Sequence, residues 1–430
     1  MTNTSSRRAA ALRALTVAAA LFLLLFLPVT APAGDDWYPE RRKDQFPTNP
    51  GHVAVPLPFN LEGIGWGVGV LGALTNVAGT CTDVSGAAFT GDITGGYLAV
   101  DQLHLVPRRL VLDLGLGYVS KASVVTYNQR GMSSDQDDYS NVEFGDMLYV
   151  GGRLTATFLD RRLEGFVGVY GGRGQLVSIR DPDGEVIAEA QDAPTETSST
   201  WIAGARLDFT DDAADPRRGL RCEGSVWRSP PVDAGPDSYL TDFSVTGYLP
   251  IGKRSTWAFT YFHSDAHVLN EGETDPAAIA DEQGLDCGSI DDPLERDRCL
   301  RYLDTVAAEN RYGSATALGG TSRLRSYGEG RFRGAHSRFV GTELRWNLTD
   351  ETTPFNIGIM RDIRTAFQIA FFYEIGTVAD REGDLWSSTR SSYGAGFRMV
   401  TASGIVYRVD LAFGDEGFVP TVFFMYPWEI

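Results

Sequence analysis

The stretch from Leu318 to Gly376 decides the fold of this chain. It opens with Leu-Gly-Gly-Thr-Ser-Arg-Leu-Arg-Ser-Tyr at positions 318–327 and passes through a polar loop to His336. Positions 340–348 then read Val-Gly-Thr-Glu-Leu-Arg-Trp-Asn-Leu, and positions 367–376 read Phe-Gln-Ile-Ala-Phe-Phe-Tyr-Glu-Ile-Gly. Side chains alternate across a strand, so each segment has one apolar face and one face that is mostly polar or small.

The same alternation recurs along most of the chain. Aromatic-rich strands that are apolar on one side only, and about 9–11 residues long or longer, are typical of a tilted wall that crosses a bilayer. We predict fourteen strands, an even number that places both ends of the chain on the periplasmic side. Their approximate bounds are 63–77, 90–105, 108–127, 141–160, 163–178, 200–212, 219–229, 239–251, 254–267, 338–348, 365–379, 391–401, 405–414 and 419–428. The sequence therefore predicts an all-β fold, a transmembrane antiparallel β-barrel.

Long and short connections alternate between these strands, as outer-membrane barrels require. The stretches 128–139, 179–199, 230–238 and 268–337 are predicted to face outward, and 106–108, 160–162, 211–219, 250–253 and 348–364 to be periplasmic. Asp211, Asp212 and Asp215 lack the spacing of a calcium-binding loop, and we expect this turn to be solvated.

Residues 1–33 are predicted to be a signal peptide. Three arginines precede an apolar run from Ala14 to Val29, and Ala31-Pro32-Ala33 ends the segment in the small-x-small pattern of a cleavage site. A membrane anchor is the alternative, since the apolar run is long. No later stretch approaches the ~20 apolar residues that a spanning helix needs.

Residues 34–60 are polar and proline-rich, and prolines interrupt regular elements. We assign this segment to the periplasm and residues 61–430 to the barrel, with 268–337 as a long extracellular or lumenal loop.

Composition and charge agree with a barrel. The chain holds 23 Phe, 17 Tyr and 8 Trp, which suit strands that are apolar on one side. It also holds 48 glycines, which suit tight turns. The formal net charge of -18 becomes -21 without Arg7, Arg8 and Arg13 of the signal peptide. Such an acidic chain disfavours nucleic acid as a partner.

The opening motif resembles a known family. Gly319-Gly320 followed by Leu324-Arg325-Ser326-Tyr327, beside a strand of the type Val-Gly-Thr-Glu-Leu-Arg, is similar to the inward-folded sixth loop of the BamA/TamA outer-membrane assembly family. That family has Val/Leu-Arg-Gly-Tyr/Phe in the loop and Phe-x-Asp-x-Gly in the next strand, where this chain has Phe372-Tyr-Glu-Ile-Gly376. Ser326 and Glu374 depart from the glycine and aspartate of the pattern. The turn at 215–219 is a second point of resemblance.

The resemblance carries several expectations. It implies that Arg325 pairs with Glu374 on the barrel wall, and that the strands number sixteen, which widens the prediction to 14–16 strands with a long inward-folded loop. It also implies periplasmic polypeptide-transport-associated modules, for which residues 34–60 leave no room. In the family, client strands enter at a weak seam between the first and last strands. Here Pro427 predicts poor pairing of the last strand beyond Tyr426.

Charged residues on the inward face form a candidate network. Buried charges must be paired to be tolerated, so we expect ion pairs among them and with the loop. The candidate residues are Gly319, Gly320, Arg325, Tyr327, Glu343, Arg345, Glu374, Gly376, Arg398, Arg408 and Asp410. Two alternatives remain open: the network rigidifies the barrel, or it takes part in gating.

The four cysteines suggest one disulfide. Cys287 and Cys299 lie twelve apart in one outward loop, in a segment with a helical pattern at 293–309, and an exported chain meets an oxidising compartment. Cys81 and Cys222 are not obvious partners, and the spacings disfavour a four-cysteine metal site.

No catalytic or cofactor site emerges from the sequence. His263, Asp265 and His267 have ligand-like spacing, but they share a face with Trp257, Phe259 and Tyr261, which places them in an interfacial girdle rather than at a metal. His336 has no evident partner. Phosphate loops and dinucleotide fingerprints are missing. We expect no metal, no cofactor and no enzymatic activity.

These observations leave two functional hypotheses. The first is insertion or export of proteins at the outer membrane of a Gram-negative bacterium, with lipids and unfolded outer-membrane or secreted proteins as partners and the barrel acting as a monomer. The second is a passive channel or structural surface barrel without assembly activity. A barrel enzyme is a weakly supported third class. The fold alone does not choose between them.

Overall fold

The structure of the chain is a computed structural model. It describes residues 50–61, 65–191, 193–212, 215–231, 235–349, 355–357, 360–363, 365–401, 406–424 and 426–428. The predicted signal peptide, residues 1–33, lies outside the described residues, as does the proline-rich segment up to residue 49.

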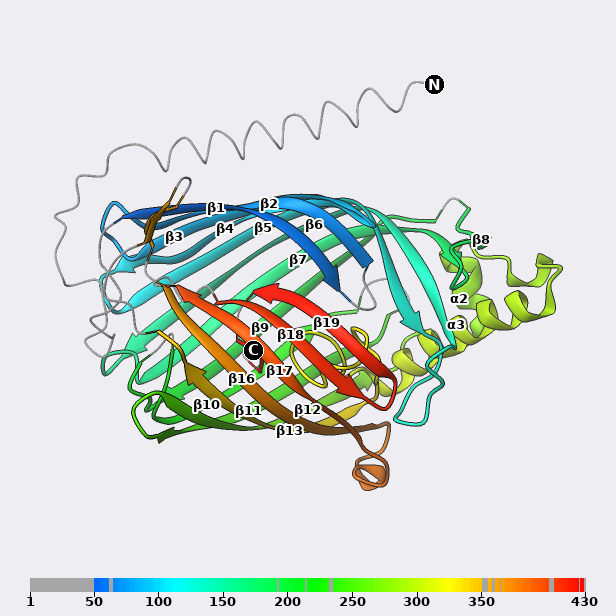
Figure 1. The fold of residues 1–430 in the computed structure, drawn as a ribbon. Coiled ribbons are helices and arrows are strands. Elements are labelled where there is room, and N and C mark those ends of the chain that lie inside the picture. The colour runs from blue at the N-terminus through cyan, green and yellow to red at the C-terminus, as the bar shows by residue number, and fades with distance from the viewer. Residues whose placement is uncertain are drawn as a thin grey trace, which may run out of the picture.

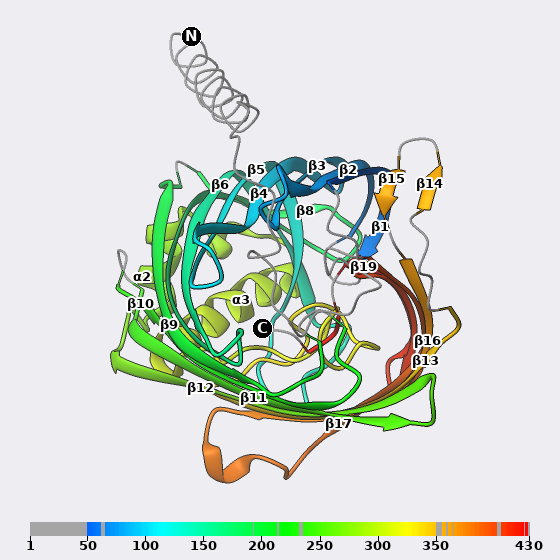
Figure 2. The same ribbon diagram turned by 90° about the vertical axis from the view of Figure 1, so that its left-hand side faces the viewer.

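The described strands wrap around a central space (Figure 1, Figure 2). The wall consists of β1 (Gly51–Leu61), β2 (Gly65–Val77), β3 (Thr82–Gly91), β4 (Ile93–Val106), β5 (Leu110–Tyr127), β6 (Tyr139–Phe158), β7 (Leu163–Arg180), β9 (Glu196–Asp208), β10 (Gly219–Ser229), β11 (Asp237–Ile251), β12 (Ser255–Asn270), β13 (His336–Asn347), β16 (Thr365–Ala379), β17 (Arg390–Thr401), β18 (Val406–Gly414) and β19 (Gly417–Phe424). Three short strands lie in connections: β8 (Val186–Glu189), β14 (Phe355–Ile357) and β15 (Met360–Ile363).

Sixteen of the described strands form this wall, each antiparallel to the next along the chain. The predicted all-β class and the range of 14–16 strands are confirmed. β1 and β19 lie side by side where the wall meets itself. Among the described residues, β1 is paired with β2 and at one position with β15, and no ladder joins it to β19.

Two strands were missed by the sequence analysis. β1 runs through Pro56 and Pro58, although we expected prolines to interrupt any element before residue 61. Proline is tolerated at the edge of a sheet, and β1 borders the seam. β3 was missed because its segment Ser85-Gly-Ala-Ala88 consists of small residues and does not alternate between large apolar and polar side chains.

The inward and outward faces follow the predicted alternation. On β13, Val340 and Trp346 are 41% and 51% exposed on the outer surface, whereas Glu343 and Arg345 are 0% and 2% exposed. β16 repeats this pattern, with Phe371 and Tyr373 outside and Glu374 inside. The period of two thus separates an apolar outer surface from a polar interior.

The connection between β12 and β13 holds the described helices of more than one turn. α2 (Pro276–Gln283) and α3 (Pro293–Tyr312) flank the short η2 (Cys287–Ser289), and they pack on β6, β7 and β8 at one end of the barrel (Figure 1). Asp292 caps α3 by accepting hydrogen bonds from the backbone N–H groups of Leu294 and Glu295. We call residues 271–317 the lid. Within the described residues no helix is both long and apolar enough to cross a membrane.

A disulfide joins Cys287 to Cys299 inside the lid, whereas Cys81 and Cys222 are not disulfide-bonded among the described residues. We expect replacement of both lid cysteines by serine to lower the free energy of unfolding of the lid by about 3 kcal/mol. Without the disulfide, the unfolded segment gains conformational freedom, which favours the unfolded state. Protease cleavage within residues 271–317 of the folded barrel should become faster. Cys222→Ser is the matched control and should leave cleavage unchanged. Equal cleavage of both variants would contradict a stabilising role for the bond.

The C-terminal end departs from the prediction of a strand over 419–428. β19 ends at Phe424, and Tyr426 and Trp428 are buried. The chain therefore turns away from the wall near Pro427 and places two aromatic side chains among the lumenal residues described below.

Candidate functional site

A loop at residues 318–335, which we call the plug loop, crosses the interior of the barrel (Figure 2). Leu318 and Phe332 pair through two backbone hydrogen bonds, of 2.9 and 2.8 Å. Gly319 and Gly320 have φ values of +103° and +106°. A Cβ at Gly319 would lie 2.4 Å from the carbonyl oxygen of Gly328, so the loop needs glycine there.

Arg325 lies at the inner tip of the plug loop, on the wall. Its Nε donates to Glu374 Oε1 at 2.9 Å, and its backbone N–H donates to Glu374 Oε2 at 3.0 Å. Its Nη1 donates to Asp410 Oδ2 at 2.9 Å and its Nη2 to Glu343 Oε2 at 3.3 Å. One guanidinium thereby joins carboxylates of β16, β18 and β13.

Further arginines of the wall hold the same carboxylates. Arg345 Nε donates to Glu343 Oε1 at 2.8 Å, and Arg398 donates to both oxygens of Glu343. Arg408 Nη1 donates to Asp410 Oδ2 at 2.6 Å. Arg408 also donates to the carbonyl oxygen of Thr321, which ties the plug loop to β18 at a second point.

We call these seven residues the lumenal network. They are Arg325, Glu343, Arg345, Glu374, Arg398, Arg408 and Asp410, and each is at most 2% exposed. Four guanidiniums thus share three carboxylates away from water. Burial alone would lower the pKa of Arg325, but the carboxylates of Glu374, Asp410 and Glu343 raise it above its ordinary value. The guanidinium also lies 3.5 Å from the centre of the Phe372 ring, a cation–π contact.

Tyr327, Ser326 and Gly376 fix the plug loop against the wall. The hydroxyl of Tyr327 donates to the carbonyl oxygen of Ser391 at 3.1 Å. A Cβ at Gly376 would lie 2.6 Å from a methyl carbon of Leu318, so glycine there makes room for the loop. Ser326 replaces the glycine of the resembled motif, and Gly414 opposite it leaves space: a Cβ on Gly414 would lie 2.2 Å from Ser326 Oγ.

The structure adds residues that the sequence analysis missed. Trp428 Nε1 donates to Glu374 Oε1 at 2.9 Å, and the hydroxyl of Tyr426 donates to Asp215 Oδ1 at 2.7 Å. Asp215 is 1% exposed, so the expectation of a solvated turn at 211–219 was wrong at this residue. The aromatic residues at the chain end were the available signal, but their inward direction depends on where β19 ends.

The histidine cluster lies on the outer face of β12 and β13. His336 Nδ1 lies 2.7 Å from Asp265 Oδ1, Arg338 Nη1 donates to the same oxygen at 2.8 Å, and His263 contacts Asp265 from the other side. His336 therefore has a partner, contrary to our expectation. His267 stacks on Tyr239 instead. In the described part of the chain, no group of three or more His, Cys, Asp or Glu side chains is arranged to hold a metal ion.

Three solved structures are similar to this chain. BamA from Haemophilus ducreyi lacking POTRA domains 1–3 matches with a TM-score of 0.46 and 12% identity, over 87% of this chain and 68% of that chain. CdiB from Escherichia coli matches with a TM-score of 0.50 and 11% identity, over 88% and 62%. CdiB from Acinetobacter baumannii matches with a TM-score of 0.47 and 11% identity, over 87% and 59%.

The chain spans about three fifths of the length of each CdiB chain. No family model and no curated protein sequence matches it. The likeness to CdiB from Escherichia coli shows a shared β-barrel fold.

Proposed function

We propose that this chain is an outer-membrane β-barrel of the BamA/TamA type in a Gram-negative bacterium. In this proposal it inserts or exports proteins, acts as a monomer without enzymatic activity, and takes unfolded outer-membrane or secreted proteins as clients. The plug loop closes the lumen at rest, and the seam between β1 and β19 is where a client strand pairs.

The observation that carries the proposal is the connection between the plug loop and the seam. Arg325 of the plug loop and Trp428, which follows β19, both donate to Glu374 Oε1. A client strand that pairs with β1 or β19 would pull on the chain end at Trp428. That movement would remove a partner from Glu374 and weaken the hold of the plug loop.

The test is assembly in lipid vesicles. Vesicles with the folded protein, and vesicles without it, receive a urea-unfolded outer-membrane barrel, and folding is followed by the gel shift of unheated samples. We expect faster folding with the protein present. Trp428→Ala removes the link through which a client strand would act on Glu374 and the plug loop, so it should reduce this acceleration. Trp201→Ala, which alters an exposed tryptophan on the outer face of β9, should not. Equal folding rates with and without the protein would refute the assembly function.

One observation favours the alternative of a passive channel. Inward-facing residues of β13 and β16 are covered by the plug loop, but Tyr149 of β6 and Tyr170 of β7 face the interior and remain 51% and 37% exposed. This side of the lumen is therefore not filled by side chains. A steady conductance in planar bilayers that is indifferent to added unfolded protein, and to removal of the plug loop, would support this alternative.

A further inference from the structure

Three aromatic side chains line the part of the lumen that the plug loop leaves uncovered. Tyr149 lies on the same face of β6 as the buried Thr155 and Thr157, and Tyr170 lies on the same face of β7 as the buried Phe166. Trp227 of β10 stacks on Tyr170, with ring centres 6.1 Å apart and planes inclined by 28°. Large aromatic rings inside a barrel that neither pack in a core nor face lipid are available for a ligand.

Hydroxyl groups lie between these rings because of the strand register. Tyr149 of β6 is paired with Gly172 of β7, and Gly172 is paired with Ser198 of β9. A Cβ at Gly172 would lie 3.3 Å from Ser198 Oγ and 3.5 Å from the Tyr149 ring, so glycine leaves these two side chains next to each other. Tyr170 is paired with Thr200, whose Oγ1 lies 3.1 Å from Ser229 Oγ.

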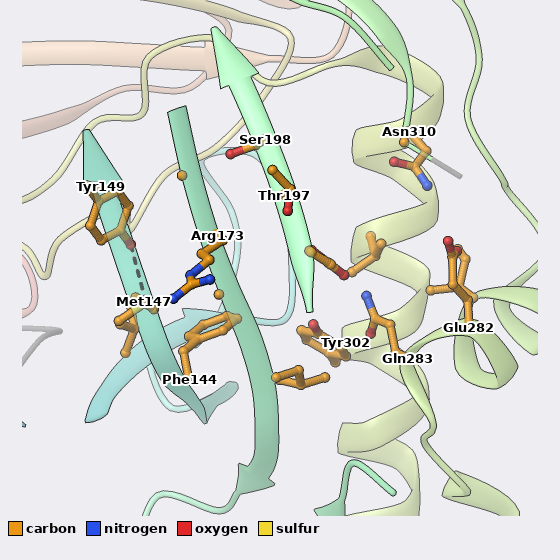
Figure 3. Close-up of a pocket in the computed structure, with 18 residues that line it drawn as sticks. Phe144, Met147, Tyr149, Arg173, Thr197, Ser198, Glu282, Gln283, Tyr302 and Asn310 are labelled. Atoms are coloured by element: carbon orange, nitrogen blue, oxygen red, sulfur yellow. Dashed lines mark hydrogen bonds between the residues drawn. The ribbon is translucent and has the colours of Figure 1, made fainter. Parts of the chain in front are cut away.

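Two cavities follow this row of residues. One of about 540 Å³ is bounded by Tyr149 and Ser198 on the wall and by Tyr302 and Gln283 on the lid (Figure 3). The other, of about 190 Å³, is lined by Thr200, Trp227 and Ser229. Ser198 and Thr200 are two residues apart on one face of β9, about 7 Å. The larger cavity is within the size range of ligand pockets.

The larger cavity contains both hydrogen-bond donors and acceptors, and one buried acceptor among them stands out. Gln283 Oε1 is buried, and no described residue donates a hydrogen bond to it. Glu196 and Glu282 add two carboxylates, and Arg173 is the one cationic residue of the described lining. A buried acceptor without a donor costs free energy, which a ligand that brings hydroxyl donors would recover.

We propose that this row of aromatic and hydroxyl side chains binds a neutral oligosaccharide. A pyranose ring has an apolar face of C–H groups, which fits against an aromatic ring, and a rim of hydroxyls, which can donate to Gln283 and the carboxylates and exchange hydrogen bonds with Ser198 and Thr200. The alternation of rings and hydroxyls along β6, β7, β9 and β10 matches a chain of such units. The two carboxylates disfavour an acidic saccharide.

The test is calorimetric titration of the full-length folded protein in a detergent without a sugar headgroup. Neutral hexasaccharides built from glucose, galactose, mannose or N-acetylglucosamine are the probes, and a hexagalacturonate is the anionic comparison. We expect at least one neutral probe to bind and the anionic probe not to bind. Lack of binding by all neutral probes, or equal binding of the anionic one, overturns the proposal.

Variants connect the binding to these residues. Trp227→Ala and Tyr149→Ala should each weaken binding at least tenfold, whereas Trp201→Ala on the outer face of β9 should leave it unchanged. The gel shift of unheated samples checks that each variant is folded. Unchanged affinity in both lumenal variants, or displacement of the saccharide by an unfolded peptide, overturns the assignment.

The source of the saccharide is a separate arm of the same experiment. The protein in lipid nanodiscs is titrated with the free hexasaccharide, with and without a neutral glycolipid that carries the same sugars. Binding of the free sugar in both discs assigns the site to dissolved saccharides. Binding that the glycolipid blocks assigns it to lipid-linked sugars, and either result supports saccharide recognition.

Discussion

Replacing Arg325 with alanine is expected to lower the free energy of unfolding by about 3–5 kcal/mol, the usual cost of removing one partner from a buried ion pair. The guanidinium contacts Glu374, Asp410 and Glu343, so its loss leaves three buried carboxylates with fewer partners. Urea titration of the barrel in lipid vesicles, followed by tryptophan fluorescence, measures this change.

The same variant should release the plug loop. We expect trypsin to cut the wild type slowly at Arg331 and Arg333, since Arg331 is buried against Glu416 and Arg333 contacts Glu309. Trypsin should cut the loop of Arg325→Ala faster, and single-channel conductance should rise. Arg311→Ala is the control: its side chain is half exposed and lies 3.7 Å from Glu271, a surface pair that contributes about 0–1 kcal/mol. An intact, protected loop in Arg325→Ala would contradict the pairing with Glu374 as its anchor.

Glu343→Gln is expected to destabilise the barrel by at least about 3 kcal/mol while preserving side-chain volume. Glu343 accepts hydrogen bonds from Arg325, Arg345 and Arg398 at once, so the variant leaves four buried guanidiniums of the lumenal network against two carboxylates. The same urea titration measures the loss.

A second substitution separates charge imbalance from lost packing. Arg398→Gln in the Glu343→Gln background removes one excess cation, so the double variant should be more stable than the sum of the two single losses predicts. Strictly additive losses would show that Glu343 and Arg398 act independently, against the short contacts between them.

Part of this structure was readable from local patterns. The alternation at 340–348 and 367–376 identified the inward-facing Glu343 and Glu374, and it also gave the class of fold. Resemblance to a known loop motif, rather than periodicity, paired Arg325 with Glu374. The spacing of Cys287 and Cys299 in one exported loop suggested their disulfide without any knowledge of the lid.

Other features depended on contacts between strands far apart in the sequence. Asp265 and His336 are neighbours only because β12 pairs with β13 in that register, whereas the whole lid and plug loop separate them in the chain. β1 was not predicted because its prolines are acceptable only at the edge of a sheet. Only the tertiary structure shows that β1 lies at such an edge, beside the seam.

The sequence by itself determined which face of each strand is apolar, because alternation is a local property of an extended backbone. Only the tertiary structure decided which residues meet across the lumen. Register among strands, the inward turn at Pro427 and the path of the plug loop bring together Arg325, Trp428 and Glu374, and they align Tyr149, Tyr170 and Trp227. These contacts arise from backbone hydrogen bonds between distant strands, which set positions that no local period encodes.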